Sequence, residues 1–142
     1  MEKTYVDELR SKFQDLSDSN QELERELLYF PDLIQLLCDM LDSDIVKKDD
    51  RLLITSALGY LIAANDIVPE EVYGPYGYMD DMYVACFVLK MLKQEYPDLV
   101  GRLWYADQSF DEIIDKCMYK SEKFLDERNL KEKLLRYCGL EE

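Results

Sequence analysis

The chain has 142 residues, of which 48% are hydrophobic, and it fits one compact domain, because domains of about 100–150 residues bury a single sizeable core. Its 31 acidic and 17 basic side chains give a formal net charge of −14, which repels phosphate backbones and anionic lipids and argues against direct binding of nucleic acid. The absence of histidine excludes Ser-His and Cys-His catalysis and histidine-based zinc sites within this chain.

The cysteines and the hydrophobic runs favour a cytoplasmic protein. Four widely spaced cysteines lie in apolar helical patterns, which predicts reduced core thiols, with disulfides as an alternative: Cys38, Cys86, Cys117 and Cys138. The start, MEKTYVDELR, is charged and lacks the apolar run of a signal peptide. The uncharged run from Leu52 to Asn65 is shorter than the roughly 20 residues that span a bilayer, so we expect a buried helix and no transmembrane segment.

The first expected element is an amphipathic helical segment over residues 1–30. Apolar side chains recur there at alternating spacings of three and four, with Asn20 in the middle of the pattern. Such a heptad pattern is typical of a coiled-coil dimer, and it predicts a homodimer through residues 6–30 as one alternative. The other is one or two helices packed on their own domain. The capping box formed by Ser19 and Glu22 favours this second alternative, because it would start a new helix.

Four helices are expected next, with bounds near 31–41, 49–64, 79–96 and 98–106. Pro31 and Asp32 suit the first turn of a helix, where a missing amide costs nothing and negative charge opposes the dipole. The helix at 49–64 is apolar almost all round, which predicts that it is central to the core. The helix at 79–96, which Pro97 would end, is expected to bury a face made of Val84, Phe87, Val88, Met91 and Leu92.

Two further helices complete the expected C-terminal region, residues 98–142. Ser109 and Glu112 form a capping box that would open one of them. The other is expected to run from near Asn129 to Gly139. Because no stretch alternates with a period of two, the predicted fold class is all-α. We expect one domain over residues 1–142, a bundle of about six or seven helices around a central apolar helical hairpin.

The segment NDIVPEEVYGPYGYMDD interrupts two apolar helices with acids, prolines, glycines and tyrosines. Asp66 to Glu70 match the pattern D-L-I-P-D with conservative changes, Val72 matches the next aliphatic position, and Gly77 to Asp81 match G-x-x-D-D. Over Leu58 to Leu89 the chain therefore resembles the YkvA-like family, a bacterial and archaeal domain of unknown function 1232. The resemblance implies a prokaryotic protein with a helical-hairpin core over residues 58–89, and it implies no activity.

The acidic residues of this segment have two interpretations. In the structural one, Asp66 closes an Asx turn and Pro69 ends the preceding helix, while Asp80 caps the next helix and Asp81 places charge at its start. In the other, Asp66, Asp80 and Asp81 converge as oxygen ligands for Mg²⁺ or Ca²⁺. That would give a cation-binding protein or a metal-dependent enzyme. We favour the structural interpretation, which requires no cofactor, because it gives every motif residue a task.

The same segment offers a surface for a partner. Tyr73 and Tyr76 are amphipathic anchors, and Glu70 and Glu71 add negative charge that suits a protein with a basic surface. Together with the absence of a catalytic constellation, this predicts a non-enzymatic, acidic protein–protein interaction or regulatory module. An inhibitor that mimics nucleic acid, and so binds a basic nucleic-acid-binding protein, stays an alternative, because it would use the charge of −14 directly.

Overall fold

The computed structural model of the protein describes residues 7, 10–11, 28–62, 79–104, 106 and 108–138. These residues form six α helices: α2 (Phe30–Leu41), α3 (Lys48–Ile62), α5 (Met79–Glu95), α6 (Pro97–Leu103), α7 (Phe110–Glu127) and α8 (Lys131–Cys138). No strand occurs in this part of the chain, and the predicted all-α fold class is confirmed. None of the described helices is long and apolar enough to cross a membrane.

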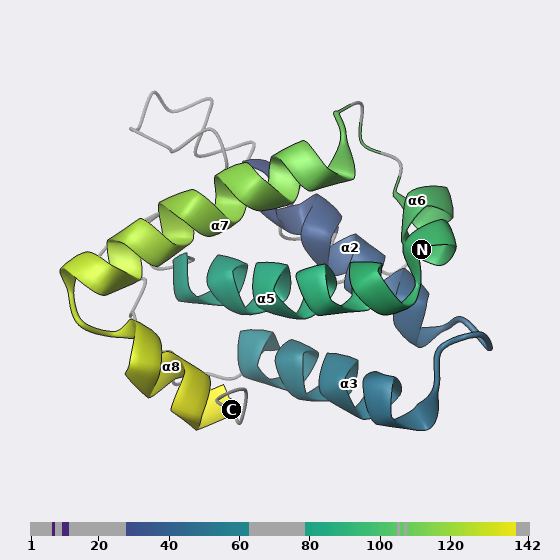
Figure 1. The fold of residues 1–142 in the computed structure, drawn as a ribbon, viewed down its shortest axis with the longest axis horizontal. Coiled ribbons are helices and arrows are strands. Elements are labelled where there is room, and N and C mark those ends of the chain that lie inside the picture. Colours follow the sequence, from purple (N-terminus) through teal and green to yellow (C-terminus); the bar gives the residue numbers. More distant parts are fainter. Residues whose placement is uncertain are drawn as a thin grey trace.

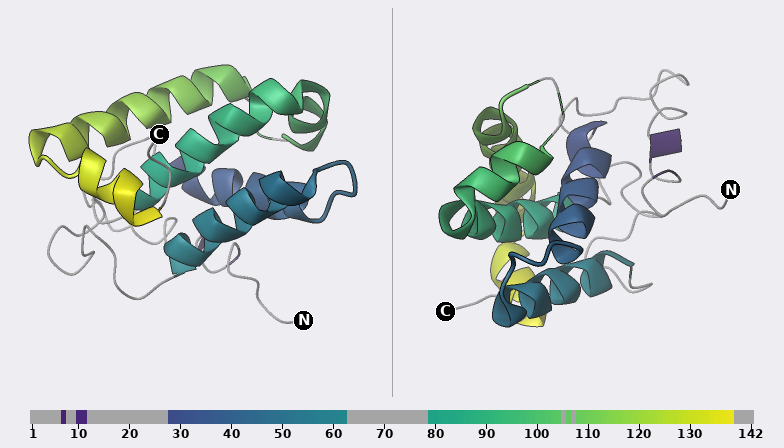
Figure 2. Two further views of the ribbon diagram at one scale, coloured as in Figure 1. Left: turned by 60° about the horizontal axis from the view of Figure 1, so that its bottom comes forward. Right: turned by 90° about the vertical axis from the view of Figure 1, so that its right-hand side faces the viewer.

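The central helix of the fold is α5 (Figure 1). α7 and α3 lie along opposite sides of it, α2 passes behind it, and the further views show the same arrangement (Figure 2). Every side chain of α5 from Met79 to Leu89 is buried except that of Phe87, which is half-buried. α3 is therefore not the central helix, contrary to the expectation for 49–64. It exposes 56% of Leu52.

The buried surface of α5 is wider than the face predicted for it. Val84, Val88 and Leu92 are buried as expected, whereas Met91 is 46% exposed and was wrongly assigned to the core. The core also takes side chains from other faces of the helix: Met82, Tyr83, Ala85, Cys86 and Leu89. Because α2, α3 and α7 enclose α5, the helix buries several of its faces, and a prediction based on a single apolar stripe misses part of its buried surface.

α2 starts where its proline predicts. Pro31 and Asp32 lie in its first turn, and the helix buries Leu33, Ile34, Leu36, Leu37 and Met40. The guanidinium of Arg10 lies 2.8 Å from the carboxylate of Asp32. This ion pair joins the N-terminal segment to α2 and favours packing of that segment on its own domain. Asn20 and the capping box at residues 19–22 lie outside the described residues.

The start of α7 differs in detail from the predicted capping box. Ser109 occupies the N-cap position, and its carbonyl accepts a hydrogen bond from the amide of Ile113 at 3.0 Å, but its side chain makes no capping hydrogen bond. α6 ends at Leu103, three residues before the expected end. The indole of Trp104 then donates to the carbonyl of Gln108 at 2.8 Å, and this bond closes the turn between the two helices.

The turn between α7 and α8 is built around a left-handed residue. Asn129 has a φ of 56°, a region in which asparagine is tolerated better than most residues. The amide of Leu130 donates to the carbonyl of Leu125 at 2.9 Å, and that of Asn129 donates to Asp126 at 3.2 Å, which is a Schellman motif. Asn129 therefore ends α7, and α8 begins two residues later at Lys131. Gly139, its expected end, lies outside the described residues.

Candidate functional site

Two tyrosine–aspartate hydrogen bonds join the antiparallel helices α3 and α5, one near each end of the pair. At one end, the hydroxyl of Tyr60 on α3 donates to Oδ2 of Asp80 on α5 at 2.6 Å. At the other end, the hydroxyl of Tyr96, which directly follows α5, donates to Oδ2 of Asp50 on α3 at 2.5 Å. The bond to Asp50 raises the pKa of the Tyr96 phenol. In the first pair the tyrosine belongs to α3 and the aspartate to α5, and in the second pair the aspartate belongs to α3. Together the two bonds hold both ends of the hairpin.

Asp80 and Asp81 are buried side by side in the first turn of α5, with 0% and 2% of their surfaces exposed. Asp80 lies inside the helix, and its carboxylate is bound by Tyr60, so it is not the N-cap residue that the structural interpretation predicted. A buried carboxylate loses its hydration, and hydrogen bonds or favourable charges within the protein must replace it. The positive end of the α5 dipole and the charge-assisted bond from Tyr60 supply part of it.

The other predicted site residues lie outside the described part of the chain: Asp66, Glu70, Glu71, Tyr73 and Tyr76. The convergence of Asp66 with Asp80 and Asp81, and the partner-binding role of the other four residues, therefore stay predictions. Among the described residues, no group of three or more acidic, cysteine or histidine side chains is arranged to hold a metal ion. The described members of the predicted metal set are the neighbours Asp80 and Asp81, and Asp80 accepts a hydrogen bond from Tyr60.

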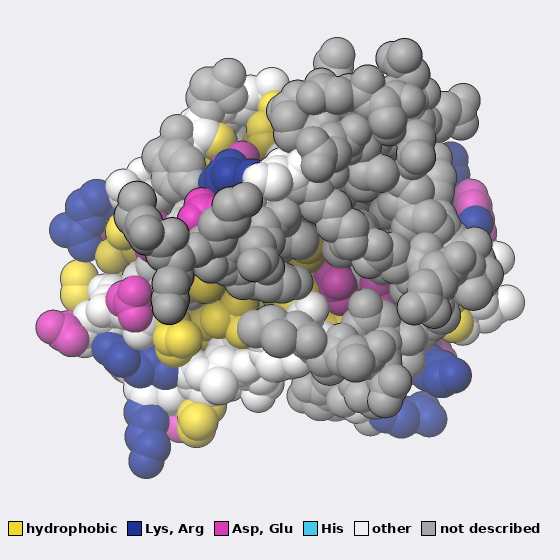
Figure 3. Space-filling view, turned by 180° about the vertical axis from the view of Figure 1, so that it is seen from behind, with side chains coloured by type: hydrophobic (Ala, Val, Ile, Leu, Met, Phe, Trp, Pro, Cys, Tyr) yellow, Lys and Arg dark blue, Asp and Glu magenta, His cyan; other side chains and the backbone are white. Residues whose placement is uncertain are grey.

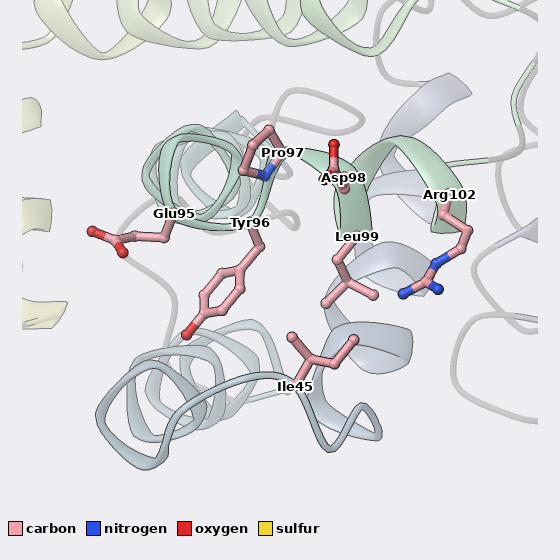
Figure 4. A pocket seen from close by; sticks show the side chains of 7 residues that line it. All are labelled: Ile45, Glu95, Tyr96, Pro97, Asp98, Leu99 and Arg102. Atoms are coloured by element: carbon pink, nitrogen blue, oxygen red, sulfur yellow. The ribbon is translucent and has the colours of Figure 1, made fainter.

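A pocket of about 290 Å³ lies where α5 meets α6 and the connection between α2 and α3 (Figure 4). Ile45 and Leu99 face each other across the pocket and make its centre apolar, and charged side chains lie at its edge. The residues that line it are Ile45, Glu95, Tyr96, Pro97, Asp98, Leu99 and Arg102. Ile45 is 58% exposed. The sequence reasoning missed this residue because an isolated isoleucine in the polar stretch SDIVKKDD belongs to no helical pattern.

The backbone beside Ile45 is fixed by side chains from other parts of the fold. The guanidinium of Arg51 donates to the carbonyl of Val46 at 3.0 Å. The backbone amide of Lys47 donates to the hydroxyl of Tyr96 at 3.0 Å. These bonds tie the backbone next to Ile45 to α3 and to the end of α5, beside the pocket.

Comparison with known proteins places this hairpin in a family. Residues 50–87 match the family model described as "Protein of unknown function (DUF1232)". The chain is also 32% identical, over 90% of its length and 87% of the relative's, to "Uncharacterized protein ORF9" of Methanothermobacter thermautotrophicus. The chain belongs to the DUF1232 family. The resemblance predicted from residues 58–89 is thus confirmed. No solved structure matches the chain.

The DUF1232 match contains three of the four residues that hold the hairpin together. Asp50, Tyr60 and Asp80 lie within residues 50–87, and Tyr96 lies beyond them. The match also begins earlier than the segment from Leu58 that carried the resemblance, and it takes in most of α3. The DUF1232 match therefore covers most of α3 and the first half of α5, the central helix.

Another tyrosine of the DUF1232 segment, Tyr83, joins α5 to α7. Its hydroxyl lies 3.4 Å from Oε2 of Glu122, and its side chain is 3% exposed. Glu122 also lies 3.7 Å from Nζ of Lys131, on α8. Burial is the main cause that raises the pKa of Tyr83 to about 12, and the negative charge of Glu122 is the next.

This raised pKa predicts a loss of stability at high pH. The unfolded chain releases the Tyr83 proton near pH 10, whereas the folded protein keeps it up to about pH 12. The stability that this difference contributes is therefore complete below pH 10 and disappears as the pH rises through 12. Urea midpoints measured across this range should fall more steeply for the native chain than for Tyr83→Phe. Tyr119→Phe, at a side chain 64% exposed, should keep the native slope. Equal slopes for all three proteins would refute the assignment.

Charges of both signs alternate along the C-terminal helices. Residues 108–138 contain seven acidic and seven basic side chains. Lys131 lies 3.7 Å from Glu122 and 3.6 Å from Asp126. Viewed from behind, the described surface likewise shows acidic and basic side chains, with hydrophobic ones gathered between them (Figure 3). A mimic of nucleic acid needs rows of carboxylates, and α7 and α8 do not supply a row free of basic residues.

Proposed function

We propose that this DUF1232 protein is a non-enzymatic, cytoplasmic interaction module that binds a partner protein with a basic surface. The observation that supports the proposal is the exposed Ile45, held beside the pocket at the junction of α5 and α6. An apolar side chain on a backbone that is already held needs less ordering when a partner covers it. Such anchors beside pockets are where binding energy concentrates in protein interfaces.

The charges around this pocket favour a basic partner. The carboxylates of Glu95 and Asp98 lie at the rim of the pocket and point away from its opening (Figure 4). Arg102 supplies one guanidinium at the same rim. An aliphatic side chain of the partner would fill the space between Ile45 and Leu99. Basic residues on either side of it would meet the rim carboxylates. The net charge of −14 would accelerate the approach of such a partner at low salt.

The segment between α3 and α5 supplies a second proposed contact. Tyr73, Tyr76, Glu70 and Glu71 keep the role that the sequence suggests for them. Tyr76→Ala should weaken binding of the same partner if both regions touch it. A homodimer through residues 6–30 is a separate proposal, against which the ion pair of Arg10 with Asp32 weighs. Sedimentation analysis tests it, since a monomer at micromolar concentration would remove the dimer.

The interaction proposal is tested by a matched pair of surface variants. Ile45→Asp and Leu52→Asp change side chains that are 58% and 56% exposed, and Leu52 does not line the pocket. Proteins captured from a host lysate by the native chain should be purified and titrated against both variants. We expect Ile45→Asp to weaken binding at least about tenfold, as loss of an interface anchor does, and Leu52→Asp to leave it unchanged. Binding that is equal for both variants would exclude the pocket.

Divalent-cation binding is the second candidate function, and the burial of Asp80 beside Asp81 is the observation that favours it. Oxygen ligands of this kind suit Mg²⁺ and Ca²⁺, and Asp66 would have to complete the set. The full chain should then melt at a higher temperature with millimolar Mg²⁺ or Ca²⁺, and Asp81→Asn should abolish the rise. The same melting temperature with and without both cations would eliminate this function.

A further inference from the structure

One side of α3 is exposed and carries no charge. Four exposed residues lie there together, since three of them stand three, four and seven positions after the first: Leu52, Thr55, Ser56 and Gly59. We call these four residues the outer face of α3. No charged residue occurs between Arg51 and Asp66, although 34% of the whole chain is charged. α3 lies at the edge of the fold, and α5, α2 and α8 pack against its other sides (Figure 1).

Nothing within a single chain requires glycine at position 59. Gly59 lies inside α3, where glycine lowers helix stability relative to alanine because it loses more conformational freedom on folding. A Cβ built at Gly59 would meet no atom outside its own helix within 4 Å, so no neighbour in the fold needs the side chain to be missing. Glycine is used where another backbone approaches closely. A contact from outside the chain therefore explains this residue.

The charge of the chain selects the occupant of the outer face. A basic partner would find no carboxylate among the four residues, and an acidic partner would find no lysine or arginine. Two copies of the chain, each with a net charge of −14, repel each other where acidic surfaces meet. Two outer faces meet without this local repulsion, and each offers the other a leucine that is 56% exposed. The best complement of the outer face is therefore the same face of a second copy, as in a two-fold symmetric dimer.

We propose that the protein forms a homodimer in which the outer faces of two α3 helices pack antiparallel across a two-fold axis. The axis passes between Thr55 and Ser56. Leu52 and Gly59 stand at equal distances from it, so Leu52 of each copy lies over Gly59 of the other copy, where the missing side chain leaves room. The antiparallel arrangement also opposes the two helix dipoles. The hydroxyl of Thr55 already donates to the carbonyl of Arg51 at 2.8 Å, so it stays paired when the face is covered.

Sedimentation equilibrium of the full chain at micromolar concentrations tests the dimer. The native chain should sediment as a dimer, and Leu52→Asp should raise its dissociation constant at least about tenfold, as loss of an interface anchor does. Met91→Asp, at a side chain 46% exposed on α5, is the matched control and should leave the constant unchanged. Added salt should strengthen the dimer, because it screens the repulsion between the two acidic chains. A native chain that stays monomeric, or equal effects of the two substitutions, would overturn the proposal.

Gly59→Ala tests the close approach of the two helices. The substitution should raise the melting temperature of the chain diluted to its monomer, because alanine favours a helix. It should also weaken the dimer severalfold, because the added methyl group meets Leu52 of the other copy. A dimer that Gly59→Ala leaves unchanged or strengthens would contradict the proposed packing.

Cross-linking locates the two-fold axis. Two copies of a Ser56→Cys variant should be joined by a short bismaleimide, and mass spectrometry should identify the peptide with position 56 linked to itself. Met91→Cys is the control and should give no such link. A dimer held by residues 6–30 would survive Leu52→Asp and give no link at position 56, which would overturn the proposal. Ile45→Asp should keep the dimer, so a failure of the pocket and a failure of the dimer are separate results.

Discussion

Leu89→Ala is expected to lower the free energy of unfolding by about 2–5 kcal/mol, the largest effect of any substitution considered for this fold. Leu89 is completely buried on α5, the helix that the other elements surround. The loss combines the transfer of the leucine side chain with the cavity left behind, which a helix enclosed on several sides collapses poorly. Urea unfolding followed by circular dichroism measures it.

Met91→Ala is the matched control on the same helix. Met91 was expected in the core, but it is 46% exposed. Its truncation should therefore cost less than about 1 kcal/mol, in the range of surface substitutions. If Met91→Ala were as costly as Leu89→Ala, the observed orientation of α5 would be wrong and the face expected from periodicity would be right.

Tyr60→Phe should lower the free energy of unfolding by about 1.5–3 kcal/mol, although it removes a single oxygen atom. That oxygen donates the 2.6 Å hydrogen bond to Asp80, whose carboxylate has no exposed surface and cannot take up water in exchange. Hydrogen bonds to buried charged groups are worth more than those between neutral groups. Tyr119→Phe removes the same atom from an exposed side chain and should change stability by less than about 0.5 kcal/mol.

The assignment of this loss to the Asp80 charge has its own check. In an Asp80→Asn background, Tyr60→Phe should cost clearly less, because the neutral amide pays a smaller desolvation penalty. The difference between the two backgrounds is the coupling energy of the pair. A coupling energy near zero would mean that Tyr60 stabilises the hairpin through packing alone.

Local signals predicted most of the helices. Pro31 marked the start of α2, Pro97 ended α5, and Ser109 marked the start of α7. These signals act within one turn of the chain, so a sequence displays them directly. The central position of α5 was not predictable in this way. Both α3 and α5 are largely apolar with charged residues near their ends, so what makes α5 central is how many neighbours enclose it, and that depends on the whole fold.

The candidate site was predicted in part for the same reason. The motif drew attention to Asp80 and Asp81, and α5 does bury both. The partner of Asp80 is 20 residues away in sequence and that of Asp50 is 46 residues away. Neither Tyr60 nor Tyr96 stood out among 11 tyrosines, since nothing in their spacing announces a contact between helices. Ile45 was missed because a lone exposed residue leaves no pattern.

The two tyrosine–aspartate bonds also determine what can change in the connection between α3 and α5. Sliding one helix along the other by a single turn, about 5.4 Å, would break the bonds at both ends of the hairpin together. Asp50, Tyr60, Asp80 and Tyr96 therefore fix the alignment of α3 and α5 from positions within or directly beside the two helices. We expect a chain of changed length between Ile62 and Met79 to leave this alignment in place as long as the four residues are kept.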